Sequence, residues 1–238
     1  MKTYNEIKLA QELIRFPTLK TEDKGIMKFL SKKLSAIGFK CTIIKSKGTG
    51  TKQALNLYAR YGKSKPHIMY LGHTDIVANL DNWKFPPFKA VVNKGYLTGR
   101  GAQDMKGGIA CWISAVSNYI KNNTVNGSIS IIISADEETK GYGCPAVMKY
   151  LRKKGEKIDF SIVGEPTSNK SVGDEIRIGR RGSMNGIIIV YGKSGHSAFF
   201  GSYINPCTTL AKIITKLKSS SLDNGTKYMP PSNLEFTK

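Results

Sequence analysis

Hydrophobic positions along the chain follow two periods, which predict alternating helices and strands. Apolar residues spaced three and four apart predict amphipathic helices at 7–14, 26–37, 109–120, 145–153 and 206–217. Short continuous apolar runs predict buried strands at 41–44, 55–61, 68–71, 128–134, 160–163 and 187–191. Helices that alternate with buried strands are typical of an α/β fold, so we expect a mostly parallel central sheet flanked by helices.

Local signals set several of the element boundaries. Thr3 and Glu6 have the spacing of a capping box ahead of the first helix. Gly38 stands where the second helix should stop, and Gly95 indicates a turn. The aromatic and proline-rich segment 83–88 is typical of a loop. Each signal falls before or between predicted elements, in agreement with the alternating pattern.

The composition of the chain and its pattern of predicted elements change after the glycine- and arginine-rich segment 179–183. Beyond it come one predicted strand, a glycine- and serine-rich loop at 192–203, one helix, and a short apolar segment at 234–237. A unit made of a strand, a helix and the start of another strand cannot bury its own faces well. We therefore predict a first domain at 1–180 and a second, partial α+β domain at 181–238.

Four clusters of polar residues lie at the ends of predicted elements. They are Gly72-His73-Thr74-Asp75, the loop from Gly99 to Gly107 with Asp104, Asp136-Glu137-Glu138, and Gly164-Glu165-Pro166. Three of them come just after a predicted strand, and the second opens a helix. Ligands of parallel α/β sheets bind beyond the carboxyl ends of the strands. One imidazole with several carboxylates is what hydrolytic metal ions need, so we predict a metal site there.

The residue types suggest individual roles within this site. Asp75 projects to the same side of an extended segment as His73 and could hold the second ring nitrogen. Asp104 could bridge two metals, because the glycines around it allow close packing. Glu137 and Glu138 point in different directions, so one could bind metal while the other acts as general base. Plainer interpretations stay open: a hydrogen-bonded His-Asp pair, a helix N-cap at Asp104 and a solvated turn at the two glutamates.

The order of the clusters resembles the dinuclear zinc aminoacylase and carboxypeptidase superfamily. Within it, the chain resembles the enzymes that remove succinate from N-succinyl-LL-2,6-diaminopimelate in lysine and diaminopimelate biosynthesis. The resemblance covers essentially the whole chain, and besides the four clusters it rests on Val163 to Thr167, Gly173-Asp174, Gly179 to Ser183 and Gly195-His196. It implies zinc-dependent hydrolysis of a succinyl amide, with two zinc ions per subunit and cobalt as an alternative metal.

The resemblance also implies how these metals are bound. His73 and Glu165 would bind one metal ion, and Glu138 would bind the second. Asp104 would bridge the two ions, and Asp75 would orient the ring of His73. A plain loop role for Glu165 stays open, since it stands directly before a proline.

Three further residues would act on the substrate. Glu137 would be the general base that activates water. In this family the histidine that matches His196 comes from the lid domain of the partner subunit and supports the oxyanion, which implies a homodimer. Arg180 would bind a substrate carboxylate, and the arginine pair Arg180-Arg181 favours the desuccinylase over acetylornithine deacetylase. A simple surface role for His196 stays open.

Two features depart from the family pattern. Phe199 stands where the family usually has a tyrosine, so a hydroxyl near the substrate is lost. The family's chain continues past a point like Lys238, and that return segment carries the last metal-ligand histidine. A rival hypothesis is therefore a truncated, catalytically impaired protein that binds at most one metal.

Composition narrows the class of protein. The 238 residues include 37 Lys and Arg against 17 Asp and Glu, for a net charge of +20. The excess is spread along the chain without a basic block, so we expect a lysine-rich surface that attracts anionic small molecules, with a nucleic-acid binder as a rival. Four widely spaced cysteines indicate free thiols in a reducing compartment. We expect a cytoplasmic protein without a membrane span, because no apolar stretch is long enough and the N-terminus makes a poor signal peptide.

Overall fold

The computed structural model describes residues 2–48, 53–78 and 81–237. The chain forms two compact units, Met1–Asp174 and Glu175–Lys238, each of which is described by itself. The division falls shortly before the boundary predicted near residue 180. The functions assigned to the two domains, catalysis in the first and a lid with dimerisation in the second, stay predictions.

The first unit contains every helix and strand that the sequence predicted for it, with small shifts at the ends. In chain order the elements are α1 (Glu6–Ile14), α2 (Ile26–Ser35), β1 (Lys40–Lys47), β2 (Gln53–Gly62), β3 (His67–His73), β4 (Val91–Asn93), β5 (Tyr96–Thr98), the π-helical turn η1 (Ala102–Lys106), α3 (Gly107–Asn122), β6 (Ser128–Ser134), α4 (Gly143–Lys153) and β7 (Phe160–Val163). The turn between β4 and β5 consists of Lys94 and Gly95, which both have positive φ, as a two-residue hairpin turn requires. The α/β class is therefore confirmed.

Five of these strands form one sheet in the order β1, β2, β6, β3, β7. The pairs of β3 with β6 and with β7 are parallel, whereas β1 with β2 and β2 with β6 are antiparallel. The sheet is thus mixed, because only a short connection separates β1 from β2 and such a connection joins antiparallel neighbours. The parallel half, made of β6, β3 and β7, is the half that carries three of the four polar clusters.

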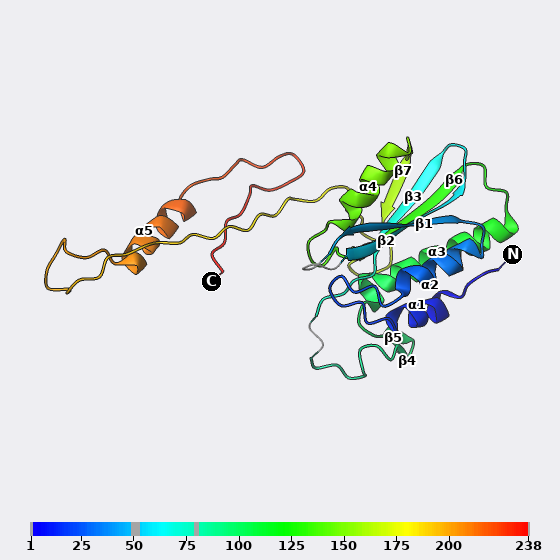
Figure 1. Cartoon of the computed structure of the whole chain (residues 1–238), viewed down its shortest axis with the longest axis horizontal. Coiled ribbons are helices and arrows are strands. Elements are labelled where there is room, and N and C mark those ends of the chain that lie inside the picture. Colours follow the sequence, from blue (N-terminus) through cyan, green and yellow to red (C-terminus); the bar gives the residue numbers. More distant parts are fainter. Residues whose placement is uncertain (1, 49–52, 79–80, 238) are drawn as a thin grey trace. The chain divides into compact units, whose positions relative to one another are not determined.

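Helices cover both faces of this sheet: α1, α2 and α3 lie on one face and α4 on the other (Figure 1). The side chains of β6 alternate between the two cores. Ile131 and Ile133 pack with α1, α2 and α3, while Ile132 packs with Val147 and Leu151 of α4. Every residue of β6 is buried. This central strand is therefore a rigid base for the residues that follow it.

The start of α1 differs from the predicted one. The side chain of Asn5 accepts the backbone N–H of Lys8 at 3.0 Å and so caps the helix. The capping box predicted from Thr3 and Glu6 is therefore wrong. Asn5 has the better position because it directly precedes the first helical residue, where its short side chain reaches the free amides of the first turn.

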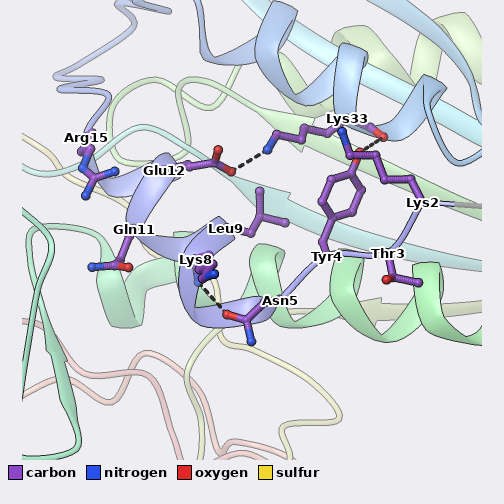
Figure 2. A pocket seen from close by; sticks show the side chains of 10 residues that line it. All are labelled: Lys2, Thr3, Tyr4, Asn5, Lys8, Leu9, Gln11, Glu12, Arg15 and Lys33. Carbon is purple, nitrogen blue, oxygen red and sulfur yellow. Dashed lines mark hydrogen bonds and ion pairs between the residues drawn. The ribbon is translucent and has the colours of Figure 1, made fainter.

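A pocket of about 400 Å³ lies beside this cap, between the N-terminal segment and Lys33 of α2 (Figure 2). The ammonium of Lys33 forms an ion pair with Glu12 at 2.6 Å and lies over the ring of Tyr4. The hydroxyl of Tyr4 in turn donates to the carbonyl of Lys33 at 2.8 Å. These contacts fasten α2 to the N-terminal helix, and the residues that make them belong to none of the polar clusters.

The described part of the second unit contains the helix α5 (Pro206–Lys218). The strand predicted at 187–191 is not formed, and the apolar segment 234–237 is not a strand either. A strand requires a hydrogen-bonded neighbour, and the described residues of this unit provide only an isolated bridge between Lys193 and Ile204. Among the described residues of both units, no helix has the length and apolar character needed to cross a bilayer.

Candidate metal centre

The carboxyl ends of three neighbouring strands meet at one edge of the sheet. Because β3 pairs in parallel with both β6 and β7, all three strands run toward the same edge. His73 is the last residue of β3, and Glu165 follows β7. Glu137 and Glu138 lie in the loop after β6, and Asp104 comes from the turn η1. The topology therefore gathers residues that lie far apart in the sequence.

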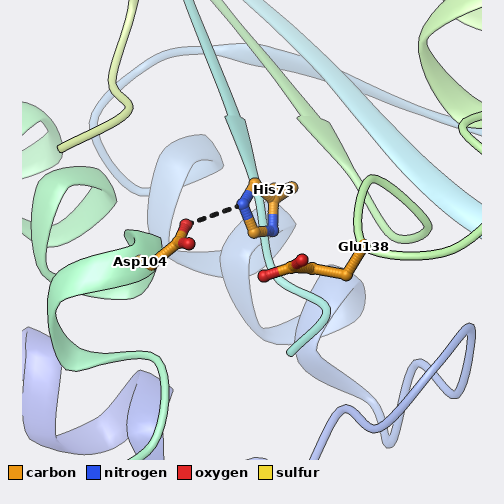
Figure 3. A group of neighbouring side chains, drawn as sticks. All are labelled: His73, Asp104 and Glu138. Atoms are coloured by element: carbon orange, nitrogen blue, oxygen red, sulfur yellow. Dashed lines mark hydrogen bonds and ion pairs between the residues drawn. The ribbon is translucent and has the colours of Figure 1, made fainter. Parts of the chain in front are cut away.

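The ring of His73 is the centre of this group. Its side chain is 2% exposed, and Nε2 lies 3.0 Å from Asp104 Oδ1 and 3.8 Å from Glu165 Oε1. The other ring nitrogen, Nδ1, lies 3.0 Å from the backbone carbonyl of Asp75. Figure 3 shows the carboxylates of Asp104 and Glu138 both turned toward the ring. With Nδ1 donating to a carbonyl, Nε2 is the nitrogen left for a metal ion.

Two sets of three side chains bring their ligand atoms within 4.8 Å of one another. They are His73, Asp104 and Glu138 in one set, and His73, Glu137 and Glu165 in the other. An imidazole nitrogen with carboxylate oxygens is a donor set that zinc takes in hydrolytic sites, so the residues fit a divalent metal. Glu137, to which the family resemblance assigned proton transfer rather than metal binding, also lies within reach of such an ion.

The carboxylate of Asp75 holds the loop that carries both glutamates. Its Oδ2 accepts the backbone N–H of Glu138 at 2.8 Å, and its Oδ1 accepts that of Glu137 at 3.2 Å. The same Oδ1 lies 3.4 Å from Nδ1 of His73, farther than the backbone carbonyl of Asp75. The carboxylate of Asp75 thus lies near the ring, and its predicted role in orienting His73 stays a prediction. The carboxylate also anchors the two glutamates, which the residue pattern did not reveal.

The surrounding carboxylates change the acid strength of His73. Burial by itself lowers the pKa of the imidazole, but Asp75, Asp104 and Glu165 outweigh it and raise the pKa to about 9. Burial, followed by the nearby Asp104 carboxylate, raises the pKa of Glu138. With this pKa the metal-free imidazole is protonated on both ring nitrogens at neutral pH, and the proton on Nε2 has to leave before a metal ion binds there.

Asp136 has a structural role that the residue pattern did not reveal. Its buried carboxylate accepts the backbone N–H groups of Tyr142 at 2.6 Å and Gly143 at 2.8 Å. Helix α4 begins at Gly143 rather than at Pro145, because Asp136 satisfies amides at its start. The loop that carries the two glutamates is thereby closed at both ends. In the sequence, the sign of this role was that a third carboxylate, Asp136, stands directly before the two glutamates predicted to act in the site.

Lys106 is a second residue whose role only packing reveals. It is completely buried, and its Nζ donates to the backbone carbonyl of Phe16 at 2.8 Å. Burial lowers the pKa of its ammonium group to about 7, while the carboxylate of Asp75 opposes that shift. A lysine beside a glycine-rich loop looks like a surface residue in a sequence, because lysines are rarely buried in proteins.

Arg180 and His196 belong to the second unit. Both are exposed there. Nδ1 of His196 accepts the backbone N–H of Ala198 at 3.2 Å, and its ring lies 5.7 Å from that of Phe199. These contacts order the loop locally and do not test a function, so substrate binding by Arg180 and oxyanion support by His196 stay predictions.

Comparison with protein families gives a match over most of the chain. The family described as Peptidase family M20/M25/M40 matches residues 69–236. The matched segment contains every residue that the sequence analysis assigned to the site, namely His73, Asp75, Asp104, Glu137, Glu138, Glu165, Arg180 and His196.

Relatives of known sequence are similar over nearly the whole of this chain. It is 49% identical to a succinyl-diaminopimelate desuccinylase of Pelagibacter ubique, in a match that covers 100% of this chain and 63% of that protein. It is 46% identical to a succinyl-diaminopimelate desuccinylase of Ehrlichia canis, over 97% of this chain and 61% of that protein. The chain thus spans about three fifths of the length of these relatives.

A tripeptidase from Staphylococcus aureus has a similar structure. The TM-score is 0.65 at 18% sequence identity, and the match covers 93% of this chain and 59% of that one. At this identity the likeness concerns the fold alone, which it supports for nearly the full chain.

Proposed function

Because this chain belongs to peptidase family M20/M25/M40, we propose that it acts as a metal-dependent amide hydrolase of the desuccinylase type. The reaction would release succinate from N-succinyl-LL-2,6-diaminopimelate in lysine and diaminopimelate biosynthesis. The observation that carries the proposal is the convergence of one imidazole and four carboxylates, from η1 and three strand ends, on one edge of the sheet. The similarity to succinyl-diaminopimelate desuccinylases supports the choice of substrate.

The proposed centre holds two zinc ions, for which cobalt is an alternative. His73 and Glu165 would hold one ion, Glu138 the other, and Asp104 would lie between them. The two sets of neighbouring ligand atoms around His73 support metal binding by these residues, without assigning each of them to one ion. Divalent metal bound there supplies Lewis acidity, which polarises an amide carbonyl and makes water more acidic.

Glu137 is the proposed general base. Its side chain is exposed at the mouth of the site, where a carboxylate can take a proton from water and pass it to the leaving amine. The neighbouring Glu138 is partly buried and turned toward His73 (Figure 3). The Asp75 carboxylate accepts the backbone N–H groups of Glu137 and Glu138. It thereby fixes the backbone from which one side chain would act as a base and the other as a metal ligand.

The second unit contributes the remaining proposed contacts. Arg180 would pair with a substrate carboxylate through its planar guanidinium. His196 would support the oxyanion from the partner subunit of a homodimer, with residues 181–238 as part of a lid and dimerisation domain. The positive charge is spread along the chain without a basic block, which supports a small anionic substrate rather than nucleic acid or membrane as the partner. Free thiols at all four cysteines support a cytoplasmic location.

Hydrolysis by the purified chain tests this proposal. With added Zn²⁺ or Co²⁺ we expect release of succinate from N-succinyl-LL-2,6-diaminopimelate, followed by chromatography of the products. Glu137→Gln should lower kcat by about 10²- to 10⁴-fold, because an amide cannot take the proton, while the bound metal measured by elemental analysis stays the same. Absence of turnover with either metal would contradict the activity, and preferred hydrolysis of N-acetylornithine would indicate a deacetylase instead.

A further inference from the structure

The buried amino group of Lys106 is hydrogen-bonded to a backbone carbonyl. Its Nζ donates to the carbonyl of Phe16 at 2.8 Å, and the Asp75 carboxylate acts on it only through its charge. Burying a cation against a neutral carbonyl is costly, and a methionine would fill similar space without that cost. The bond to Phe16 is therefore what a lysine, unlike an apolar residue, provides at this position.

The Phe16 carbonyl belongs to a short segment, residues 16–19, that also holds the chain just after β3. The hydroxyl of Thr18 donates to the carbonyl of Thr74, and the N–H of Ile76 donates to the carbonyl of Thr18 at 3.2 Å. The two stretches also form an isolated parallel bridge. Segment 16–19 is thus bonded to Lys106 on one side and to the continuation of β3 on the other.

We propose that Lys106 is a positioning residue that fixes Asp104 relative to His73 through segment 16–19. Asp104 stands two residues before Lys106, and His73 directly precedes the stretch that the segment holds. The tether therefore joins the two backbones whose side chains meet at 3.0 Å (Figure 3). The N–H of Lys106 also closes the turn by donating to the carbonyl of Gly101 at 2.9 Å, so a shift of Lys106 is passed on to Asp104.

This inference rests on the proposed function, in that Asp104 and His73 are taken as metal ligands, and Zn²⁺ affinity of the full chain tests it. Lys106→Met keeps the length of the side chain and removes the donor, and calorimetric titration should show affinity about tenfold lower. Thr18→Val removes the hydroxyl at the other end of the tether and should also weaken binding. Because both act through one tether, the double variant should bind Zn²⁺ about as weakly as the worse single variant.

Lys33→Met is the matched control. It removes a lysine that also fastens two elements together, but through the ion pair and ring contacts between α2 and the N-terminal helix (Figure 2). We expect it to lower the melting temperature and to leave Zn²⁺ affinity within about twofold. Unchanged affinity in a folded Lys106→Met variant, or losses that multiply in the double variant, would overturn the proposal.

Exchange of the Ile76 amide hydrogen separates this proposal from the proposed function. In the metal-free chain, the tether predicts exchange about tenfold faster in Lys106→Met than in the unsubstituted protein, because the acceptor on Thr18 is no longer held. If the unsubstituted chain binds no Zn²⁺, the proposed function fails, and the exchange rates alone decide on the tether. Equal rates in the two proteins would overturn it.

Discussion

At the scale of single residues, Asp75 connects three parts of the metal centre. Its two carboxylate oxygens accept the backbone amides of Glu137 and Glu138, and one of them lies 3.4 Å from the ring of His73. An ionised aspartate suits this position because both oxygens accept hydrogen bonds, whereas an asparagine would place an NH₂ group against one of the amides. The identity of the side chain, and not its size, therefore maintains the geometry of the loop.

Asp75→Asn tests this directly. We expect stability to fall by about 1–3 kcal/mol, because one buried amide loses its acceptor, and Zn²⁺ affinity to fall about 10- to 100-fold as both glutamates shift. Asp23→Asn is the matched control, since Asp23 also accepts two backbone amides, those of Gly25 and Met27, but at the start of α2. Equal losses of Zn²⁺ affinity in the two variants, measured by calorimetry, would contradict a specific role of Asp75.

Residue patterns predicted the ligand candidates but not every residue that supports them. His73 and Glu165 could be found because ionisable side chains after apolar strands are unusual, and Asp104 because it lies in a glycine-rich loop that opens a helix. Asp136 and Lys106 could not, because their roles depend on backbone groups that only the folded chain brings near. A side chain that bonds to a distant carbonyl or amide leaves no trace in the spacing of residue types.

At the scale of elements, β3 and β7 are packed closely where Tyr70 passes Gly164. A Cβ added to Gly164 would overlap the hydroxyl of Tyr70, which is itself only 4% exposed. Gly164 directly precedes Glu165, so the packing of these two strands sets the position of that carboxylate. The hydroxyl of Tyr70 is buried without a hydrogen-bond partner among the residues the structure describes, so shape rather than bonding governs this contact.

Gly164→Ala should therefore disturb both the strand pair and the metal centre. We expect a loss of stability of about 1–3 kcal/mol from overpacking, measured by urea unfolding, together with weaker Zn²⁺ binding. Tyr70→Phe removes the overlapping oxygen but leaves the ring carbons that also overlap the added Cβ, so the double variant should regain only a small part of the loss. Gly186→Ala is the control, because nothing lies within 4 Å of its added Cβ. A cost no larger than that of Gly186→Ala would show that the contact is not restrictive.

Helices and strands could be predicted where the residues within the element are sufficient to determine it. The helices and strands of the first unit follow from apolar periodicity, which reports burial on one or two faces. Strand direction did not follow throughout, since the antiparallel pairing of β2 with the distant β6 depends on the order of strands in the sheet. The segment 187–191 has the composition of a strand but is not one, because a strand also requires a neighbour.

At the scale of the whole molecule, the dominant feature is the net charge of +20. Such a charge creates a positive potential that attracts anions from solution and is screened by salt over about 10 Å at 0.1 M. The proposed substrate carries three carboxylates and one ammonium group, so it is an anion that this potential would attract. The charge thus bears on the rate of encounter and not on the fold.

Salt should consequently weaken substrate capture. We expect KM for N-succinyl-LL-2,6-diaminopimelate to rise severalfold between about 0.05 M and about 0.5 M NaCl, with a smaller change in kcat. N-acetylornithine, which has no net charge, serves as the control substrate and should show little change. A KM that does not depend on salt would contradict electrostatic capture. Band shifts with nucleic acid at low salt, lost steeply as salt rises, would instead support the nucleic-acid rival.

The sequence by itself determined the α/β class, the succession of elements in the first unit, and which polar clusters are candidates for a metal site. These are local properties, because each depends on the spacing and type of residues within one segment. Only the tertiary structure decided the mixed order of the sheet, the anchoring of both glutamates by Asp75, and the burial of Lys106 against Phe16. These depend on hydrogen bonds and packing between distant segments, which exist only once the chain has folded.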